Sequence, residues 1–176
     1  KTTLGTKNLI PSSQPYNSSL FGYAGTESVT NIQANIVDWV LVEIRQGTTT
    51  VAKKAGLLKS DGSIIDPVSQ SELTFDGPDS LTYQVIIRHR NHLAISTNSN
   101  IAITANQTTS LDLTTNNNIK GANQVMLKSG IFGLRLGNPN GNNVINSQDR
   151  SLTRTGGDAN GVYRPEDLNM DGIISS

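Results

Sequence analysis

The sequence lacks, or has little of, several residue types on which particular protein classes depend. Its 176 residues include no cysteine, which excludes a disulfide framework and zinc sites built from thiolates. The net charge is zero, so the sequence indicates no basic surface for nucleic acid or for acidic membrane lipids. No apolar run approaches the roughly 18 residues that mark a membrane-spanning helix. We therefore expect no nucleic-acid partner and no membrane insertion.

What the sequence does contain is a large share of small and uncharged polar residues. Hydrophobic residues make up 35% of the chain and charged residues only 16%, while glycine occurs 16 times. Asn, Thr, Ser and Gln are abundant among the rest, a composition that favours extracellular all-β modules over cytosolic enzymes. We therefore expect an extracellular or cell-surface location. No signal peptide precedes Lys1, so we expect the chain to be one part of a larger secreted protein.

Short strands separated by turn residues predict the fold class. Residues 36–45 are rich in β-branched and aromatic side chains and are typical of a strand. A Gln46-Gly47 turn leads into residues 49–58, which we expect to form a hairpin with the first strand. Further predicted strands cover residues 63–66, 73–75, 81–90, 93–97, 101–104 and 108–113. The pattern favours a mainly β fold, an antiparallel β-sandwich of immunoglobulin-like or jelly-roll type over residues 1–120.

The rest of the chain divides into a connector and a loop-rich tail. A polar tract at residues 114–121 is the best candidate for a linker. Residues 121–136 are predicted to be a connector or a strand that docks onto the sandwich. Residues 137–176 form the tail, in which residues 147–155 predict a short helix with Ser147 as its cap.

The tail contains two segments whose spacing of oxygen-bearing residues matches an EF-hand-type calcium loop. The second segment, loop two, reads D-x-N-x-D-G-x-I-S from Asp167 to Ser175. Calcium takes about six to eight oxygen ligands, and positions 1, 3, 5, 7, 9 and 12 of such a loop direct oxygens to one point. Position six must turn sharply, which Gly172 allows. The predicted ligands of loop two are Asp167, Asn169, Asp171, Ile173 and Ser175.

The first segment, loop one, keeps the same spacing through position twelve but replaces the early acids with asparagine. Asn143 stands at position six, where asparagine tolerates the left-handed backbone conformation. Asp149 brings the one carboxylate of this set, so weak calcium binding or none is expected. The predicted ligands of loop one are Asn138, Asn140, Asn142, Val144, Asn146 and Asp149, with Val144 contributing its backbone carbonyl.

The two loops differ in charge and in completeness. Loop two brings two carboxylates, but its position twelve would be residue 178, so Asp158, Glu166 or water is expected to close it. Loop one is complete through Asp149, and we expect it to bind calcium more tightly than loop two in this chain. Plainer interpretations stay open for both: a tight Asx turn for loop two and a β-hairpin turn for loop one.

The tandem of loops resembles a dockerin, a small calcium-stabilised module that binds partner modules in cellulose-degrading complexes. The resemblance covers roughly residues 137–176. It extends over nine positions of loop two, whereas loop one matches in its spacing. It implies Ca²⁺ as the bound ion and a protein module as the partner.

The upstream chain resembles a module near the C-terminus of large secreted bacterial surface proteins. The resemblance rests on Ile36-Val-Asp-Trp-Val-Leu-Val-Glu-Ile-Arg45, Ala55-Gly-Leu-Leu-Lys-Ser-Asp-Gly62 and Val85-Ile-Ile-Arg-His-Arg-Asn-His-Leu93. In that family a segment like Gly161-Val-Tyr-Arg-Pro-Glu-Asp-Leu-Asn-Met-Asp-Gly172 follows. The resemblance implies an accessory region without catalytic activity.

A few other residues are candidates for chemistry. His89 and His92 are the only histidines, and they suit a structural hydrogen-bonding role better than a metal site, for which no third ligand is fixed. Ligand contact by these histidines stays open. Asp38, Glu43 and Glu72 could be paired glycosidase carboxylates, but acids on the solvent face of a strand are a commoner arrangement.

Aromatic side chains are too sparse, at 5%, for a dedicated sugar-binding surface. Trp39 stands within an apolar strand, so we expect it in the core. The candidate rings for stacking on a sugar are Tyr16, Tyr23, Trp39, Tyr83 and Tyr163.

The sequence as a whole predicts a calcium-stabilised accessory module rather than an enzyme. We expect a structural or adhesive role, with a protein module or a polysaccharide as the partner. The alternatives are a carbohydrate-binding module and the accessory region of a polysaccharide-degrading enzyme.

Overall fold

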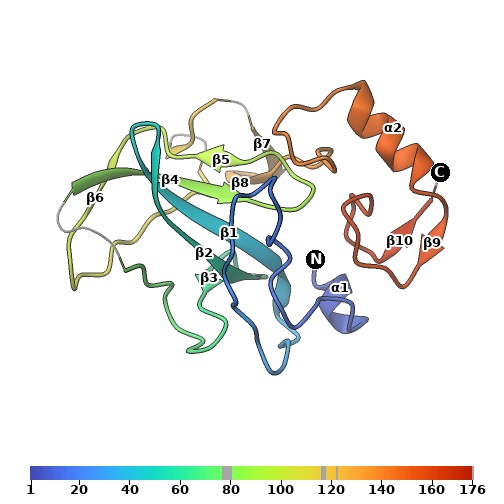
Figure 1. Cartoon of the computed structure of the whole chain (residues 1–176), viewed down its shortest axis with the longest axis horizontal. Coiled ribbons are helices and arrows are strands. Elements are labelled where there is room, and N and C mark those ends of the chain that lie inside the picture. Colours follow the sequence, from blue (N-terminus) through green and yellow to red (C-terminus); the bar gives the residue numbers. More distant parts are fainter. Residues whose placement is uncertain (77–80, 116–117, 122, 176) are drawn as a thin grey trace.

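A six-stranded antiparallel sheet forms the centre of the molecule. The computed structural model describes residues 1–76, 81–115, 118–121 and 123–175. The strands run in the order β3-β2-β1-β4-β5, with β6 also paired to β4 (Figure 1). Their bounds are β1 Ile36–Gln46, β2 Thr49–Lys59, β3 Ile64–Ile65, β4 Leu81–Arg88, β5 Ile95–Ser96 and β6 Ile101–Ile103. The prediction of a mainly β fold with antiparallel pairing is confirmed.

Strand β1 lies in the middle of this sheet and is buried along almost its whole length. Trp39 and Leu41 face a first core cluster, in which Tyr16 of the N-terminal segment packs. Val40 and Val42 face a second cluster on the other side of the sheet. Because both faces are covered, β1 is apolar on both sides instead of alternating with polar residues. Trp39 is fully buried, as predicted.

Irregular segments supply much of the covering on both faces of the sheet. Residues 73–75 and 108–113 do not form strands, in contrast to the sequence prediction. Leu73, Phe75 and Leu113 instead pack their side chains against the second core cluster. Their apolar residues serve the core through side-chain contact, which needs no strand ladder.

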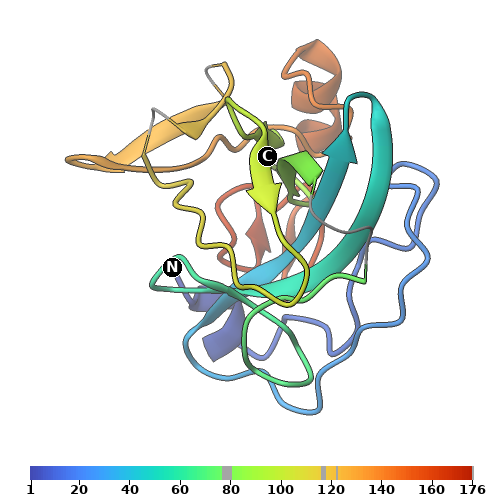
Figure 2. The same cartoon turned by 90° about the vertical axis from the view of Figure 1, so that its left-hand side faces the viewer.

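In the described ranges, the remaining elements form two small sheets and two helices. The bounds are α1 Thr3–Thr6, β7 Gln124–Lys128, β8 Ile131–Leu134, α2 Ser147–Thr155, β9 Ala159–Asn160 and β10 Ile173–Ile174. Strands β7 and β8 pair as a hairpin that extends from the body of the molecule (Figure 2). None of the helices in the described ranges is long and apolar enough to cross a membrane.

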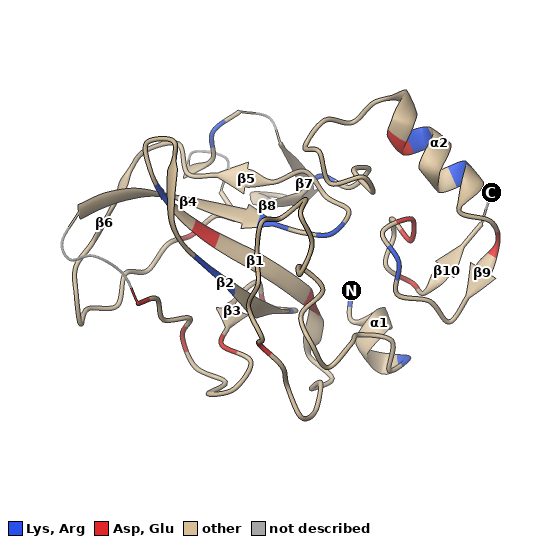
Figure 3. Cartoon of the chain, viewed as in Figure 1, with Lys and Arg blue, Asp and Glu red and all other residues tan. Residues whose placement is uncertain are grey.

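The tail packs back onto the sheet beside the N-terminal segment, as Figure 1 shows on the right of the view. Tyr163 and Met170 contact the first core cluster, and Lys7 Nζ donates a hydrogen bond to the carbonyl of Asp171 at 2.6 Å. Basic and acidic residues are interspersed over the sheet, the loops and the tail (Figure 3).

Candidate calcium loops and the buried network beside them

Loop one begins at Asn138, which the segment after β4 holds in place. The Asn138 amide donates to the carbonyl of Asn91 at 3.0 Å, and its side-chain Nδ2 donates to the carbonyl of His92 at 3.3 Å. Further along, the side-chain oxygen of Asn143 accepts from the amide of Ala94 at 2.5 Å. Both ends of the first half of loop one are therefore tied to residues 91–94.

Successive Asx turns shape the middle of loop one. The Oδ1 atom of Asn140 accepts from the amide of Asn142 at 3.0 Å, and Oδ1 of Asn142 accepts from the amide of Val144 at 2.8 Å. Asn143 has φ of 66°, the left-handed conformation expected at position six. No strand pairing links the two halves of this loop in the part of the chain that the structure describes, so it is not a β-hairpin turn.

The end of loop one is the first turn of helix α2. Asn146 has an extended backbone, and its side-chain oxygen accepts from the amide of Gln148 at 2.8 Å. Its own amide donates to Oδ2 of Asp149 at 2.9 Å, which completes a capping box. The helix bounds match the prediction, but the cap is Asn146 instead of Ser147, because Ser147 is itself the first helical residue.

Two oxygen atoms of loop one are buried without a hydrogen-bond partner. They are Oδ1 of Asn138, at position one, and Oδ1 of Asp149, at position twelve. The two residues are 2% and 3% exposed. Leaving such an oxygen unpaired costs about 1–3 kcal/mol, so buried polar groups are nearly always satisfied. A bound cation would satisfy both atoms, and oxygens are the ligands that Ca²⁺ prefers.

Loop two satisfies its oxygens within the loop. Asp167 is 1% exposed, and its carboxylate accepts from the amides of Asp171 at 3.2 Å and Gly172 at 2.8 Å. The carboxylate of Asp171 accepts from the amide of Ile173 at 2.8 Å and from Nδ2 of Asn169 at 3.0 Å. This arrangement is the tight Asx turn that the plainer interpretation predicts.

The remaining positions of loop two lie at the edge of the small β9–β10 sheet. Ile173 pairs with Asn160, and Ser175 follows as an exposed residue. Gly172 has φ of 79°, and a methyl group there would collide with Leu9. Of the two residues expected to close this loop, Glu166 pairs through Oε1 with Arg164 at 3.3 Å while its Oε2 is buried without a hydrogen-bond partner, and Asp158 is exposed.

No group of three or more His, Cys, Asp or Glu side chains that could hold a metal ion occurs in the described part of the chain. Loop one contains one such residue, Asp149, and loop two contains Asp167 and Asp171. The other predicted ligands are amide oxygens, backbone carbonyls and the Ser175 hydroxyl. Such sets suit a hard cation bound weakly rather than a transition metal.

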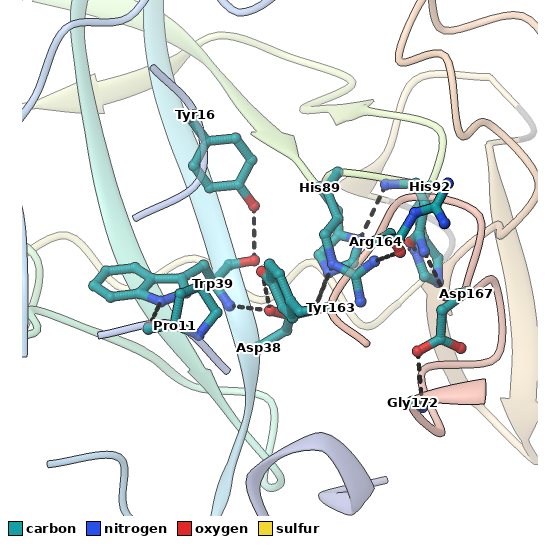
Figure 4. Close-up of polar contacts among 12 residues, drawn as sticks. Pro11, Tyr16, Asp38, Trp39, His89, His92, Tyr163, Arg164, Asp167 and Gly172 are labelled. Carbon is teal, nitrogen blue, oxygen red and sulfur yellow. Dashed lines mark hydrogen bonds and ion pairs between the residues drawn. The ribbon is translucent and has the colours of Figure 1, made fainter. Parts of the chain in front are cut away.

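A buried polar network joins the sheet to the tail next to the loops (Figure 4). Its centre is Asp38 of β1, which is fully buried. The carboxylate accepts from His89 Nε2 at 3.0 Å, from Arg90 Nε at 3.2 Å and from the Tyr163 hydroxyl at 2.6 Å. The Arg90 guanidinium lies 4.2 Å from the centroid of the Tyr163 ring and donates to the carbonyl of Arg164. Sheet and tail therefore share one set of buried charges.

The charges in this network shift the pKa values of its members. Burial alone would raise the pKa of Asp38, but the hydrogen bond and charge of His89 and the charge of Arg90 hold it below its ordinary value. Burial and the neighbouring charges of His89 and Arg90 lower the pKa of His92 to about 3. Burial, with the charge of Asp38, raises the pKa of Tyr163 well above its ordinary value. Asp38 is thus a carboxylate, and Tyr163 keeps its proton and donates it.

The expectation that the three candidate acids face solvent is wrong for two of them. Asp38 and Glu43 are both 0% exposed, whereas Glu72 is exposed. Glu43 accepts from Arg88 at 2.9 Å and Arg45 at 2.5 Å, which compensates its burial. The hydrogen-bonding role predicted for His89 is confirmed.

The aromatic side chains proposed as sugar platforms are largely covered. Tyr16 and Trp39 are fully buried, and Tyr83 is 2% exposed. The Tyr23 hydroxyl donates to Glu27, and the Tyr163 hydroxyl donates to Asp38. These rings do not form an exposed strip on the sheet.

Sequence reasoning missed Asn91, which is fully buried and contacts both loops. Its one signal was its position between the two histidines, in a segment rich in hydrogen-bonding side chains. No family model, curated protein or solved structure matches this chain.

Proposed function

We propose that this chain is a non-catalytic extracellular module with a structural or adhesive role, stabilised by Ca²⁺ in its tail. In this proposal residues 1–120 form a β-sandwich module and residues 137–176 a dockerin-like loop segment. The observation that carries it is the pair of buried, unpaired oxygens at positions one and twelve of loop one. Those are the first and last ligand positions of an EF-hand-type loop.

Loop one is the principal site of the proposal. Its ligands would be the side chains of Asn138, Asn140, Asn142, Asn146 and Asp149 with the Val144 carbonyl. The turn geometry at positions three to seven supports this assignment, because Asx turns and the left-handed Asn143 already curve the chain. Since Asp149 supplies the one carboxylate, we expect a dissociation constant near the millimolar end of the extracellular range.

Loop two is a second, weaker site in this proposal. Its ligands would be the side chains of Asp167, Asn169, Asp171 and Ser175 with the Ile173 carbonyl. Each carboxylate oxygen keeps a lone pair beyond the hydrogen bond it accepts, so ligation and the observed turn are compatible. The internal hydrogen bonds already stabilise the turn without an ion, which lowers the gain that calcium would bring.

A protein partner is better supported than a polysaccharide. Asp149 is the one buried residue of α2 in the described chain, and the rest of this helix is exposed or half-buried. Val144, Ile145 and Leu152, on or next to the helix, expose 55%, 45% and 39% of their surface. Exposed apolar side chains beside a helix fit contact with another protein. Of the aromatic rings that a sugar would need, Tyr16, Trp39 and Tyr83 are buried, and Tyr23 and Tyr163 are half-buried.

Thermal unfolding tests the proposal. A ligand that binds the folded state alone raises stability by RT ln(1 + [L]/Kd), so millimolar Ca²⁺ should raise Tm relative to excess chelator. Asp149→Asn should remove most of this gain, and Mg²⁺ should give a smaller one because it demands a tighter octahedral site. Coincident melting curves with Ca²⁺ and with chelator would contradict the proposal.

A further inference from the structure

We infer that Asn91 is a positioning residue that couples loop one to loop two, so that calcium in one loop raises the affinity of the other. The inference rests on the proposed function, because it assigns a regulatory link to the same two loops. Its structural basis is that one residue of the sheet module is hydrogen-bonded to the first position of both loops.

The two contacts use different parts of Asn91. Its backbone carbonyl accepts from the amide of Asn138, position one of loop one, at 3.0 Å and from the amide of Gly137 at 3.2 Å. Its side-chain Nδ2 donates to the carbonyl of Asp167, position one of loop two, at 2.7 Å. Asn91 is 0% exposed, so water does not compete for these bonds.

The orientation of the Asn91 amide is fixed from the other side. Its Oδ1 atom lies 2.7 Å from Nδ1 of His92 and 3.0 Å from Nδ1 of His89. Nε2 of His89 in turn contacts Asp38, which holds the imidazole in place. An amide flip would turn the NH₂ group toward the two rings and take its donor away from Asp167. The observed orientation is therefore the one in which Nδ2 reaches the Asp167 carbonyl.

Other contacts hold each loop separately. Arg90 donates to the carbonyl of Arg164, just before loop two, and Lys7 donates to the carbonyl of Asp171 within it. Ala94 donates to Asn143 in loop one. Asn91 differs from these residues because its bonds reach both loops through a rigid, buried group. Ordering the first residue of one loop therefore restrains the first residue of the other, and coupling between two binding sites is reciprocal.

Calcium titration of six chains, three backgrounds each with and without Asp167→Asn, tests this link. In the otherwise unchanged chain, Asp167→Asn, which weakens loop two, should lower the calcium affinity of loop one at least about fivefold, the low end of typical coupling. Asn91→Ala keeps the backbone contact to loop one but removes the contact to loop two. In that background, Asp167→Asn should no longer change the affinity of loop one. Lys7→Met is the matched control, since it removes a loop-two contact that does not reach loop one, and the coupling should persist.

Amide hydrogen exchange provides the measurement that does not depend on calcium. In excess chelator, Asp167→Asn should speed exchange at the Asn138 amide at least about fivefold in the parent chain, and not in the Asn91→Ala background. If exchange is coupled but no calcium binds, the link stands and the proposed function fails. If calcium binds and Asp167→Asn leaves both the affinity of loop one and the Asn138 exchange unchanged, the link is wrong. If Asn91→Ala does not fold, Asn91→Ser takes its place, since it also removes the donor to the Asp167 carbonyl, and a parent pair without coupling still overturns the link.

Discussion

Loop one and loop two share a spacing but reach opposite states of hydrogen bonding. Loop one, with its asparagines, leaves one oxygen of Asn138 and one of Asp149 buried and unpaired. Loop two, with its two aspartates, engages both carboxylates with amides of its own chain. The number of carboxylates alone would predict that loop two binds calcium more tightly than loop one. The unpaired oxygens instead indicate that loop one binds calcium more tightly, because an ion there would remove the desolvation cost of two buried oxygens.

The difference also shows how each loop depends on the sheet. Loop one is held by hydrogen bonds of Asn138 and Asn143 to residues 91–94, whereas the residues before loop two reach the buried Asp38 through Tyr163. Weakening Asp38 should therefore disturb loop two more than loop one. Four predictions test or refine this contrast.

The largest expected effect is that of Asp38→Ala. It leaves Arg90 and His89 buried without their carboxylate and removes the acceptor of the Tyr163 hydroxyl, so we expect a loss of about 3–5 kcal/mol in the free energy of unfolding. Urea denaturation measures the loss, and hydrogen exchange should show loop two opening before loop one. Glu72→Ala, at an exposed acid outside this network, is the control and should change stability little. If Asp38→Ala left the free energy of unfolding unchanged, the network would not hold the tail.

A methyl group at position six of loop two should come next. Gly172 has a positive φ and packs against Leu9, so Gly172→Ala combines backbone strain with a collision, and we expect a loss of about 2–3 kcal/mol. Gly161 has a positive φ of 68° with open space around it. Gly161→Ala should therefore cost only the backbone part, about 1 kcal/mol. If thermal unfolding showed equal losses of stability for Gly172→Ala and Gly161→Ala, the contact between position 172 and Leu9 would not contribute.

Acidification should weaken the support of loop one. The unfolded chain protonates His92 below about pH 6.5, whereas the folded chain, with a pKa of about 3, stays neutral there. The unfolded state therefore binds more protons between these values, and stability falls as pH falls through this window. We expect about 2 kcal/mol less at pH 5 than at pH 8 from this residue. His92→Gln should reduce the loss, and an unchanged pH dependence would show that His92 does not cause it.

The smallest effect separates the two loops directly. With a millimolar dissociation constant, tenfold excess Ca²⁺ adds about 1.4 kcal/mol to stability. Asp149→Ala should abolish this gain, while Asp171→Ala should mostly spare it. Each variant is compared with itself in chelator, which cancels the helix-cap loss that Asp149→Ala also causes. If Asp171→Ala abolishes the gain and Asp149→Ala does not, loop two is the principal site.

Local patterns in the sequence predicted the local structure well. The β1–β2 hairpin and the bounds of α2 follow from side-chain propensity and turn residues within each segment. The prediction of strands at residues 73–75 and 108–113 was wrong, because apolar side chains there pack against the core from segments of irregular backbone. A short apolar run does not distinguish these two situations.

The buried network was beyond prediction from the sequence because its members are far apart along the chain. Asp38 looked like a solvent-facing acid of a strand, yet His89, Arg90 and Tyr163 surround it once the chain folds. The ligand spacing of the loops could be read directly, since it is local. Which oxygens stay unpaired could not be read from the sequence, because burial depends on the folded chain: Asn138, for example, is held by Asn91 and His92.

The bond between Asp38 and Tyr163 has a consequence for the order of events during synthesis. The two residues are separated by 125 positions in the chain. At about 5–20 residues per second, a ribosome needs roughly 6–25 s to add that stretch. Strand β1 therefore emerges with its carboxylate unpaired and can complete its buried surroundings only after the tail arrives. Contacts of such long sequence separation form late, so we expect closure of the tail over the sheet to be the last folding step.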